Sequence, residues 1–233
     1  MVIGVGDYPH PSIKPLVYSV PDAQEVYNIL TQYYNFDPNR TQLLLNPTRA
    51  QLIGAFSAYV PSGQTPLRET DNLLVFYAGH GEWDEDYREG YWLPSDAEAR
   101  NRANWVSNSD IQRAFRAIKA KHILLLSDAC FAGSMFATRE ALKNIAVEEA
   151  YKETSRKAIT AGNLTAVPDR SVFKEFLVKQ LKENPNKYLD AGTLYNSIKI
   201  PVTNNSKTRQ RPIYGTIQDT GDEGGEFIFV KRN

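Results

Sequence analysis

Two uninterrupted strings of apolar residues constrain the fold of this chain most strongly. Residues 73–78 (LLVFYA) and 123–126 (ILLL) contain no charged side chain. Both strings are far shorter than the ~20 residues that a membrane-spanning helix needs. A strand with one face in water alternates apolar and polar residues, whereas a strand of a parallel sheet covered by helices is apolar on both faces. The strings therefore predict central strands of a parallel sheet with helices on both sides.

Strand and helix patterns alternate along the rest of the sequence, which favours an α/β fold. Strands are predicted for residues 2–5, 42–45, 73–77, 122–126, 158–160 and 227–230, and helices for residues 21–34, 48–59, about 108–119, 172–181 and 191–198. Thr48 is suited to cap the second helix, and Asn108 or Ser109 the third. We predict one domain over residues 1–233, with a central, mostly parallel sheet of about six strands flanked by helices.

Three segments between these elements have weaker patterns. An acidic turn at residues 82–89 precedes a small hairpin that is predicted around residues 91–94. Residues 131–157 are rich in charge and alanine, so they are predicted to form a helix or a mobile loop. Residues 203–211 are polar and lack a core pattern, which predicts an exposed loop.

Charge and cysteine content exclude several classes of protein. The 27 basic residues balance the 27 acidic ones, so nucleic acid and membranes are not expected as partners. The single cysteine excludes an internal disulfide and favours a reducing compartment, so we expect a cytoplasmic protein. The first residues, MVIGVG, lack the basic region of a signal peptide. The first predicted strand starts at the second residue, which leaves open a regulatory domain or partner outside this chain.

A histidine and the cysteine follow two neighbouring predicted strands. His80 comes after residues 73–77, and Cys130 comes after residues 122–126. Ligands of open parallel sheets bind outside the carboxyl ends of the strands, and neighbouring strands lie ~5 Å apart. The two side chains can therefore face one another. A cysteine nucleophile needs this arrangement, because the imidazole accepts the thiol proton and stabilises the thiolate.

Small residues surround both positions, so the backbone can approach a ligand closely. Gly79 and Gly81 flank His80, and Ala129 precedes Cys130. The backbone N–H groups of Gly81 and Cys130 are candidate donors of an oxyanion hole.

Each reactive residue also has a structural interpretation. A lone buried cysteine usually acts as a small hydrophobe, and a lone histidine usually forms structural hydrogen bonds. The shared position of His80 and Cys130 at strand ends favours the catalytic interpretation. His10, in a loop flanked by prolines, and His122, at the start of a strand, lack this context and are predicted to be structural or solvated.

Two motifs resemble the signatures of the caspase-like cysteine peptidases (clan CD, peptidase C14), particularly their metacaspase and prokaryotic branch. The motifs are YAGHG at residues 77–81 and SDACFAG at residues 127–133, and His80 precedes Cys130 by 50 residues. The resemblance implies a caspase-like three-layer sandwich. It further implies a large-subunit-like part at residues 1–135, a linker at about 136–157 and a small-subunit-like part at 158–233.

The resemblance also implies an activity. Cys130 would attack the scissile carbonyl, and His80 would protonate the leaving amine. Asp128, two residues before the cysteine, and Asp22 in PDA (21–23) resemble the acids of a pocket for Arg or Lys at P1. Two carboxylates suit a guanidinium, which forms bidentate hydrogen bonds. Ala78 would line this pocket at a position where metacaspases often have serine. The implied partner is a protein or peptide substrate with a basic P1 residue.

Two further segments follow from the resemblance. Residues 158–162 (AITAG), with Thr160 and Ala161, resemble the next strand of the family, whose edge pairs with the substrate backbone. The linker is cut in caspases, and this chain has the basic residues Arg139, Lys143, Lys152, Arg156 and Lys157 there. Self-cleavage in the linker is one interpretation, and an uncut helix with a solvated charged face is the other.

The candidate acids have structural alternatives as well. Asp22 could act only on the positive end of its own helix, and Asp128 could hydrogen-bond backbone in a turn. The acidic turn contains Glu82, Asp84, Glu85, Asp86 and Glu89 without the spacing of a calcium loop. We therefore expect a solvated turn, no metal site and no cofactor, with a calcium requirement left open.

Two other functions are alternatives to a peptidase. The first is a caspase-like pseudoenzyme that serves as a binding or signalling module, although such a protein would be expected to lack the cysteine or the histidine. The second is a nucleotide-binding module. Residues 4–6 (GVG) supply only two glycines of the dinucleotide motif, and the sequence has no phosphate-loop lysine motif.

Overall fold

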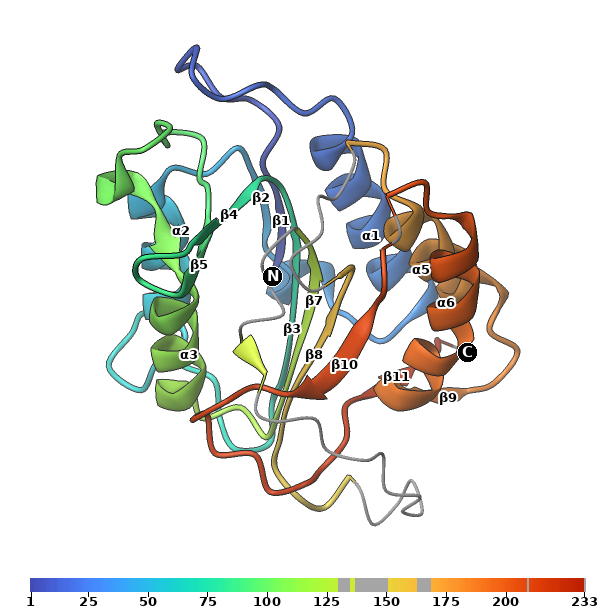
Figure 1. Cartoon of the computed structure of the whole chain (residues 1–233). Helices are drawn as coiled ribbons and strands as arrows, with labels where there is room; N and C mark the ends of the chain where they lie inside the picture. Colours follow the sequence, from blue (N-terminus) through green and yellow to red (C-terminus); the bar gives the residue numbers. More distant parts are fainter. Residues whose placement is uncertain (130–134, 137–150, 163–168, 209, 233) are drawn as a thin grey trace.

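A six-stranded sheet forms the middle of the molecule (Figure 1). The computed structural model describes residues 1–129, 135–136, 151–162, 169–208 and 210–232. In spatial order the strands are β10 (Ile213–Thr216), β8 (Ser155–Thr160), β7 (His122–Asp128), β3 (Asn72–Ala78), β1 (Val2–Gly4) and β2 (Leu43–Leu45). All neighbours are parallel except β10, which runs antiparallel to β8. The predicted mostly parallel sheet of about six strands is confirmed.

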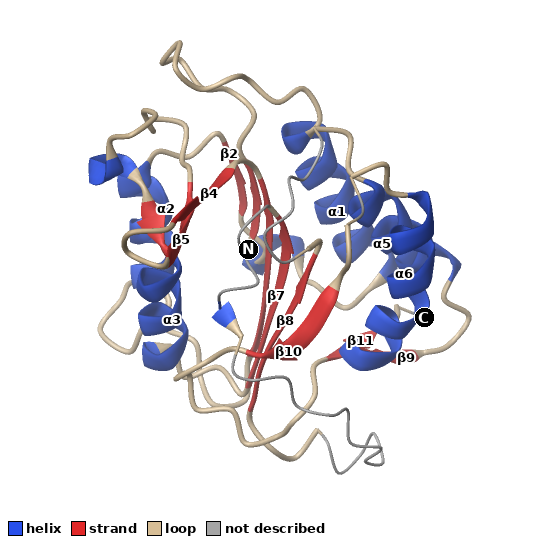
Figure 2. Cartoon of the chain, in the orientation of Figure 1, coloured by secondary structure: helices blue, strands red, loops and turns tan. Residues whose placement is uncertain are grey.

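Helices cover both faces of this sheet, so the fold has three layers (Figure 2). One face carries α2 (Arg49–Ala58) and α3 (Asn108–Ala117), and the other carries α1 (Ser19–Tyr33), α5 (Val172–Glu183) and α6 (Ala191–Asn205). Alternate residues of β7 enter two separate hydrophobic cores. Ile123 and Leu125 pack with α2 and α3, whereas Leu124 and Leu126 pack with α1, α5 and α6. This double burial explains why the strings are apolar without interruption.

The sixth strand of the sheet differs from the predicted one. Residues 227–230 do contain a strand, β11 (Ile228–Val230), but it pairs with β9 (Tyr188–Asp190) in a separate two-stranded sheet. The main sheet ends instead with β10, which the sequence analysis missed. Its four residues are all half-buried, so they have neither a continuous apolar string nor a clear alternation.

The acidic segment forms a hairpin whose turn, at residues 85–88, is exposed. β4 (Gly81–Asp84) and β5 (Glu89–Trp92) form a hairpin from the acidic residues themselves, and β6 (Val106–Ser107) adds a third strand. Asp84 accepts hydrogen bonds from the backbone N–H groups of Asp86 and Tyr87 and pairs with Arg102. The predicted hairpin therefore begins ten residues earlier than expected.

Several helix ends also differ from the predictions. Thr48 caps α2 in a capping box with Gln51, as expected. α3 is capped by Ser107 rather than by Asn108 or Ser109, because the Ser107 hydroxyl accepts from the Asp110 N–H. α6 continues through Pro201 to Asn205, so the first part of the predicted loop at 203–211 is helical.

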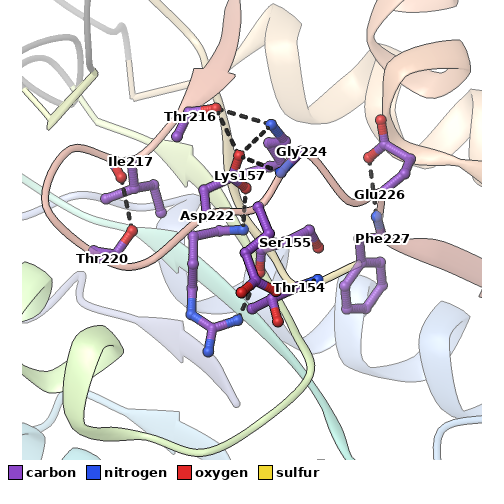
Figure 3. Close-up of polar contacts among 12 residues, drawn as sticks. Thr154, Ser155, Lys157, Thr216, Ile217, Thr220, Asp222, Gly224, Glu226 and Phe227 are labelled. Atoms are coloured by element: carbon purple, nitrogen blue, oxygen red, sulfur yellow. Dashed lines mark hydrogen bonds and ion pairs between the residues drawn. The ribbon is translucent and has the colours of Figure 1, made fainter. Parts of the chain in front are cut away.

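β8 starts three residues before the predicted strand, so the last three residues of the expected linker belong to it. Arg156 and Lys157 lie within β8 and are buried. Lys157 Nζ lies 2.9 Å from Asp222 Oδ2 and 2.8 Å from Thr216 Oγ1, and the Gly224 N–H donates to the same carboxylate (Figure 3). The expectation that Arg156 and Lys157 offer sites for self-cleavage is therefore wrong, because both are fixed in the sheet.

We predict that Asp222→Ala destabilises the protein strongly. The Lys157–Asp222 pair has side chains that are only 11% and 7% exposed, and removing one partner leaves a buried charge. The expected loss in the free energy of unfolding is about 3 kcal/mol or more, measured by urea denaturation. Arg113→Ala serves as the control, because the Arg113 side chain is 63% exposed in its pair with Asp110. That change should cost about 0.5 kcal/mol or less. Equal losses would contradict the prediction.

Candidate active site

The carboxyl ends of the central strands meet at one edge of the sheet. In the register of β3 and β7, Ala78 lies opposite Asp128, and His80 and Cys130 each follow this pair by two residues. Cys130 lies outside the described residues, so its approach to His80 remains a prediction. What the structure describes at this edge is the histidine, both candidate acids and the elements that hold them.

The His80 imidazole is fixed by the backbone of the loop that follows β1. Its Nε2 lies 2.8 Å from the carbonyl oxygen of Lys14. A carbonyl oxygen can only accept a hydrogen bond, so this contact requires the proton on Nε2. Among the described residues Nδ1 has no hydrogen-bond partner. Nδ1 therefore lies on the side of the ring away from Lys14.

Two tyrosines hold the backbone of His80. The His80 N–H donates to the Tyr8 hydroxyl at 3.0 Å, and the Tyr77 hydroxyl donates to the His80 carbonyl at 2.8 Å. The Tyr8 ring also packs against the imidazole, with centroids 5.1 Å apart. Tyr8 and Lys14 were not among the predicted site residues. Their position after the first strand, at the same edge of the sheet, was the available signal.

The predicted oxyanion donor Gly81 follows His80 directly. It is the first residue of β4 and pairs with Trp92 of β5. The other predicted donor, the backbone N–H of Cys130, lies outside the described residues.

The Asp128 carboxyl is buried at the end of β7. Alternation along the strand turns it toward α1 and α5, on the same face as Leu126. The Ser171 hydroxyl, which caps α5, donates to Asp128 Oδ1 at 2.7 Å. Burial raises the pKa of Asp128 to about 7, although the bond from Ser171 acts in the opposite direction.

The Asp22 carboxyl comes from the first turn of α1 and has a cationic partner. Lys174 Nζ, from the first turn of α5, lies 2.5 Å from Asp22 Oδ1 and 2.9 Å from Glu25 Oε2. Burial of Lys174 acts to lower its pKa, but hydrogen bonds to Asp22 and Glu25 raise it above its usual value. Asp22 is close enough to Asp128 for its charge to contribute to the raised pKa of Asp128. The structure thus brings the two candidate acids together.

The other predicted substrate-binding residues have little accessible surface. Ala78 is 3% exposed, and Thr160 and Ala161 are fully buried. Thr160 pairs with Ser127 of β7 on one side and with Ile213 of β10 on the other. Both edges of β8 are therefore occupied along residues 158–160, and the expected pairing of substrate backbone with this part of the strand is wrong.

His122 and two surface hollows lie toward the amino ends of the strands, whereas His10 lies in the loop after β1. His122 is buried, bonds to Ser155 Oγ at 3.0 Å, and has its pKa lowered to about 4 by burial, so its contacts are those of a structural residue. His10 is exposed and lies 2.7 Å from Ser12 Oγ. Two surface hollows of about 710 and 460 Å³ are lined by residues at the amino ends of β1, β3, β7 and β8.

The described part of the chain offers neither a cluster of metal ligands nor a membrane-spanning helix. No group of three or more His, Cys, Asp or Glu side chains is arranged there to hold a metal ion. None of the described helices has the length and apolar character required to traverse a bilayer.

Comparison with known proteins identifies the class of this fold. The family model of the caspase domain, Peptidase C14, matches residues 1–219, and the chain therefore belongs to the caspase-domain family. The crystal structure of protein GSU0716 from Geobacter sulfurreducens is similar, with 15% identity, a TM-score of 0.62 and coverage of 96% of this chain and 97% of that one. A structure described as pro-sf-caspase-1 has 14% identity, a TM-score of 0.61 and coverage of 92% and 85%. No curated protein matches the chain.

Membership of the caspase-domain family confirms the predicted resemblance to the caspase-like peptidases. The predicted caspase-like sandwich is confirmed as well. Members of the caspase-domain family are typically cysteine peptidases, so the domain indicates a hydrolase that acts on a protein substrate. The structural neighbours share the fold at low identity and add no residue roles.

We predict that Asp128 makes the protein less stable as the pH rises. Its pKa is about 7 in the folded state and about 4 in an unfolded chain. Between these values the folded protein retains a proton that the unfolded chain releases, so the free energy of unfolding falls from pH 4 toward pH 7. Asp128→Asn should remove this part of the decline. The decline is measured as the difference in the free energy of unfolding between pH 5 and pH 8, determined by urea denaturation.

Burial also raises the pKa of Glu226 to about 7, so Glu226 contributes to the pH dependence of the wild type as well. The contribution of Asp128 is therefore taken as the difference in pH dependence between wild type and variant. Glu85→Gln, in the exposed hairpin turn, is the control and should leave the pH dependence unchanged. An Asp128→Asn protein with the wild-type pH profile would show that Asp128 ionises normally.

Proposed function

We propose that the protein is a cysteine endopeptidase with Cys130 as nucleophile and His80 as its base and acid, and that it cleaves after Arg or Lys. The observation that supports the pair best is the hydrogen bond between His80 Nε2 and the Lys14 carbonyl. It leaves Nδ1 as the nitrogen that can accept a proton from a thiol. Cys130 follows Asp128 by two residues, as His80 follows Ala78.

The proposed reaction balances without a cofactor. Nδ1 of His80 takes the thiol proton, and Cys130 Sγ forms a bond to the scissile carbonyl carbon. As the tetrahedral intermediate collapses, the C–N bond breaks and the imidazolium gives its proton to the leaving amine. Water then hydrolyses the thioester and regenerates the thiol. The backbone N–H groups of Gly81 and Cys130 are the proposed donors to the oxyanion.

The proposed preference for basic P1 residues depends on Asp22 and Asp128. Both carboxyls are buried, lie near one another and come from α1 and β7 at the catalytic edge of the sheet. Buried carboxylates are costly without a cationic or hydrogen-bonding partner. A guanidinium has the donors to bind two such groups at once.

The assignment is tested with a panel of fluorogenic peptides that differ only at P1, assayed with and without calcium. We expect cleavage after Arg or Lys. Cys130→Ala and His80→Ala should each lower kcat by about 10³-fold or more. His10→Ala, at the exposed histidine, should change it little. A folded Cys130→Ala protein with near wild-type activity would contradict the nucleophile, and a preference for Asp at P1 would contradict the pocket. No cleavage of any peptide would favour a binding or signalling module.

We propose that self-cleavage occurs only after basic residues that precede β8 in the sequence. The basic candidates outside that strand are Arg139, Lys143 and Lys152, of which the first two lie outside the described residues. We expect mass spectrometry of aged protein to find cuts after these residues, and none after Arg156 or Lys157, which are buried in β8. The cuts should be absent from Cys130→Ala. Cleavage after Lys157 in folded protein would contradict both the proposal and the structure of this strand.

A further inference from the structure

The first turn of α5 already supplies partners to both candidate P1 acids. Lys174 lies 2.5 Å from Asp22, and Ser171 donates to Asp128 at 2.7 Å. Ser171 is the residue that caps α5, and its hydroxyl also accepts from the Lys174 N–H at 3.3 Å. One short segment therefore fixes the hydroxyl and the ammonium group relative to each other.

The two acids are partnered unequally. Asp22 has a full positive charge beside it, and the Lys174 side chain is only 13% exposed. Asp128 receives a hydrogen bond from a neutral hydroxyl, and the charge of Lys174 acts on it without forming an ion pair among the described residues. A cationic ligand can therefore add charge compensation at Asp128, whereas at Asp22 it meets a cation that is already bound.

Lys174 also has a second anion within reach. Its Nζ lies 2.9 Å from Glu25 Oε2, one turn along α1 from Asp22, and the Glu25 side chain is 37% exposed. Glu25 Oε1 lies 2.8 Å from Lys182 Nζ, and Oε2 is the oxygen that faces Lys174. If Nζ leaves Asp22, it retains Glu25 Oε2 as a partner and does not become an unpaired buried charge. The cost of freeing Asp22 is thereby reduced.

We infer that Lys174 is a specificity-determining residue that competes with the basic P1 side chain for Asp22, and that substrate binds by displacing its ammonium group onto Glu25. The inference rests on the proposed function and adds to it an internal competitor. A P1 lysine offers Asp22 the same kind of charge that Lys174 already supplies. A P1 arginine presents a planar fork of donors that can span both carboxyls, so it displaces Lys174 more effectively.

The principal test is Lys174→Gln, which removes the charge and keeps a donor. Binding of agmatine, a small guanidinium compound, is measured by isothermal titration calorimetry. We expect Lys174→Gln to bind agmatine at least about tenfold more tightly than wild type. In peptide assays the KM for Arg and Lys substrates should fall with little change in kcat, and the preference for Arg over Lys should narrow. Lys179→Gln, an exposed lysine of α5, is the matched control and should match wild type.

A second variant tests the displaced position independently. Glu25→Gln removes the anion that receives Lys174, so the KM for a basic P1 residue should rise and agmatine should bind more weakly. If Lys174→Gln does not fold, this variant decides the question.

The outcomes separate this inference from the proposed function. Equal agmatine affinity and KM in wild type and Lys174→Gln, with cleavage after Arg intact, would overturn the competition and leave the peptidase in place. Stronger binding by Glu25→Gln would overturn the displacement onto Glu25. Failure of every protein to bind agmatine or to cleave after Arg or Lys would overturn the inference together with the P1 proposal.

Discussion

The parallel pairing of β3 with β7 is the constraint on which the rest of this structure depends. All seven residues of each strand are in register, from Asn72 opposite His122 to Ala78 opposite Asp128. A shift by one residue would exchange the two faces of a strand. The apolar strings would tolerate that shift, because both faces are buried. Asp128 would not, because it would leave Ser171 and enter the core under α2 and α3. The polar residue at the strand end therefore helps to define the register.

Two sets of contacts hold His80 and the two candidate acids at the carboxyl ends of the strands, and Asp169 links the two sets. The loop after β1 fixes His80 through Tyr8 and the Lys14 carbonyl, whereas α1 and α5 hold the acids. Asp169, just before α5, accepts hydrogen bonds from the backbone N–H groups of Val17 and Tyr18, at the end of that loop. A displacement of α5 is consequently transmitted to the segment that orients the imidazole.

The sequence was sufficient for the layers of the fold and for the candidate histidine and acids, because each depends on local pattern or on a motif at a strand end. The sequence was insufficient to predict contacts between side chains that lie far apart in the chain. Nothing near Asp22 in the sequence indicates Lys174, about 150 residues later, and the Lys14 contact uses a backbone atom that any residue supplies. Lys157 was misplaced in the linker because its charge suggested solvent, whereas its contacts with Asp222 and Thr216 explain its burial. β10 was missed because a half-buried edge strand lacks a strong period.

The pairing of β7 with β8 determines what would happen if the chain between these two strands were cleaved. They pair in parallel from His122 opposite Ser155 to Ser127 opposite Thr160, and both apolar layers extend across this boundary. The amino-terminal and carboxy-terminal pieces would thus remain one folded body after the peptide bond between them was lost. Such a nick would remove a covalent tether and leave the interface intact, so strand pairing and apolar packing alone would hold the two pieces together. It would change the freedom of the severed ends without changing the mass of the native particle beyond one added water.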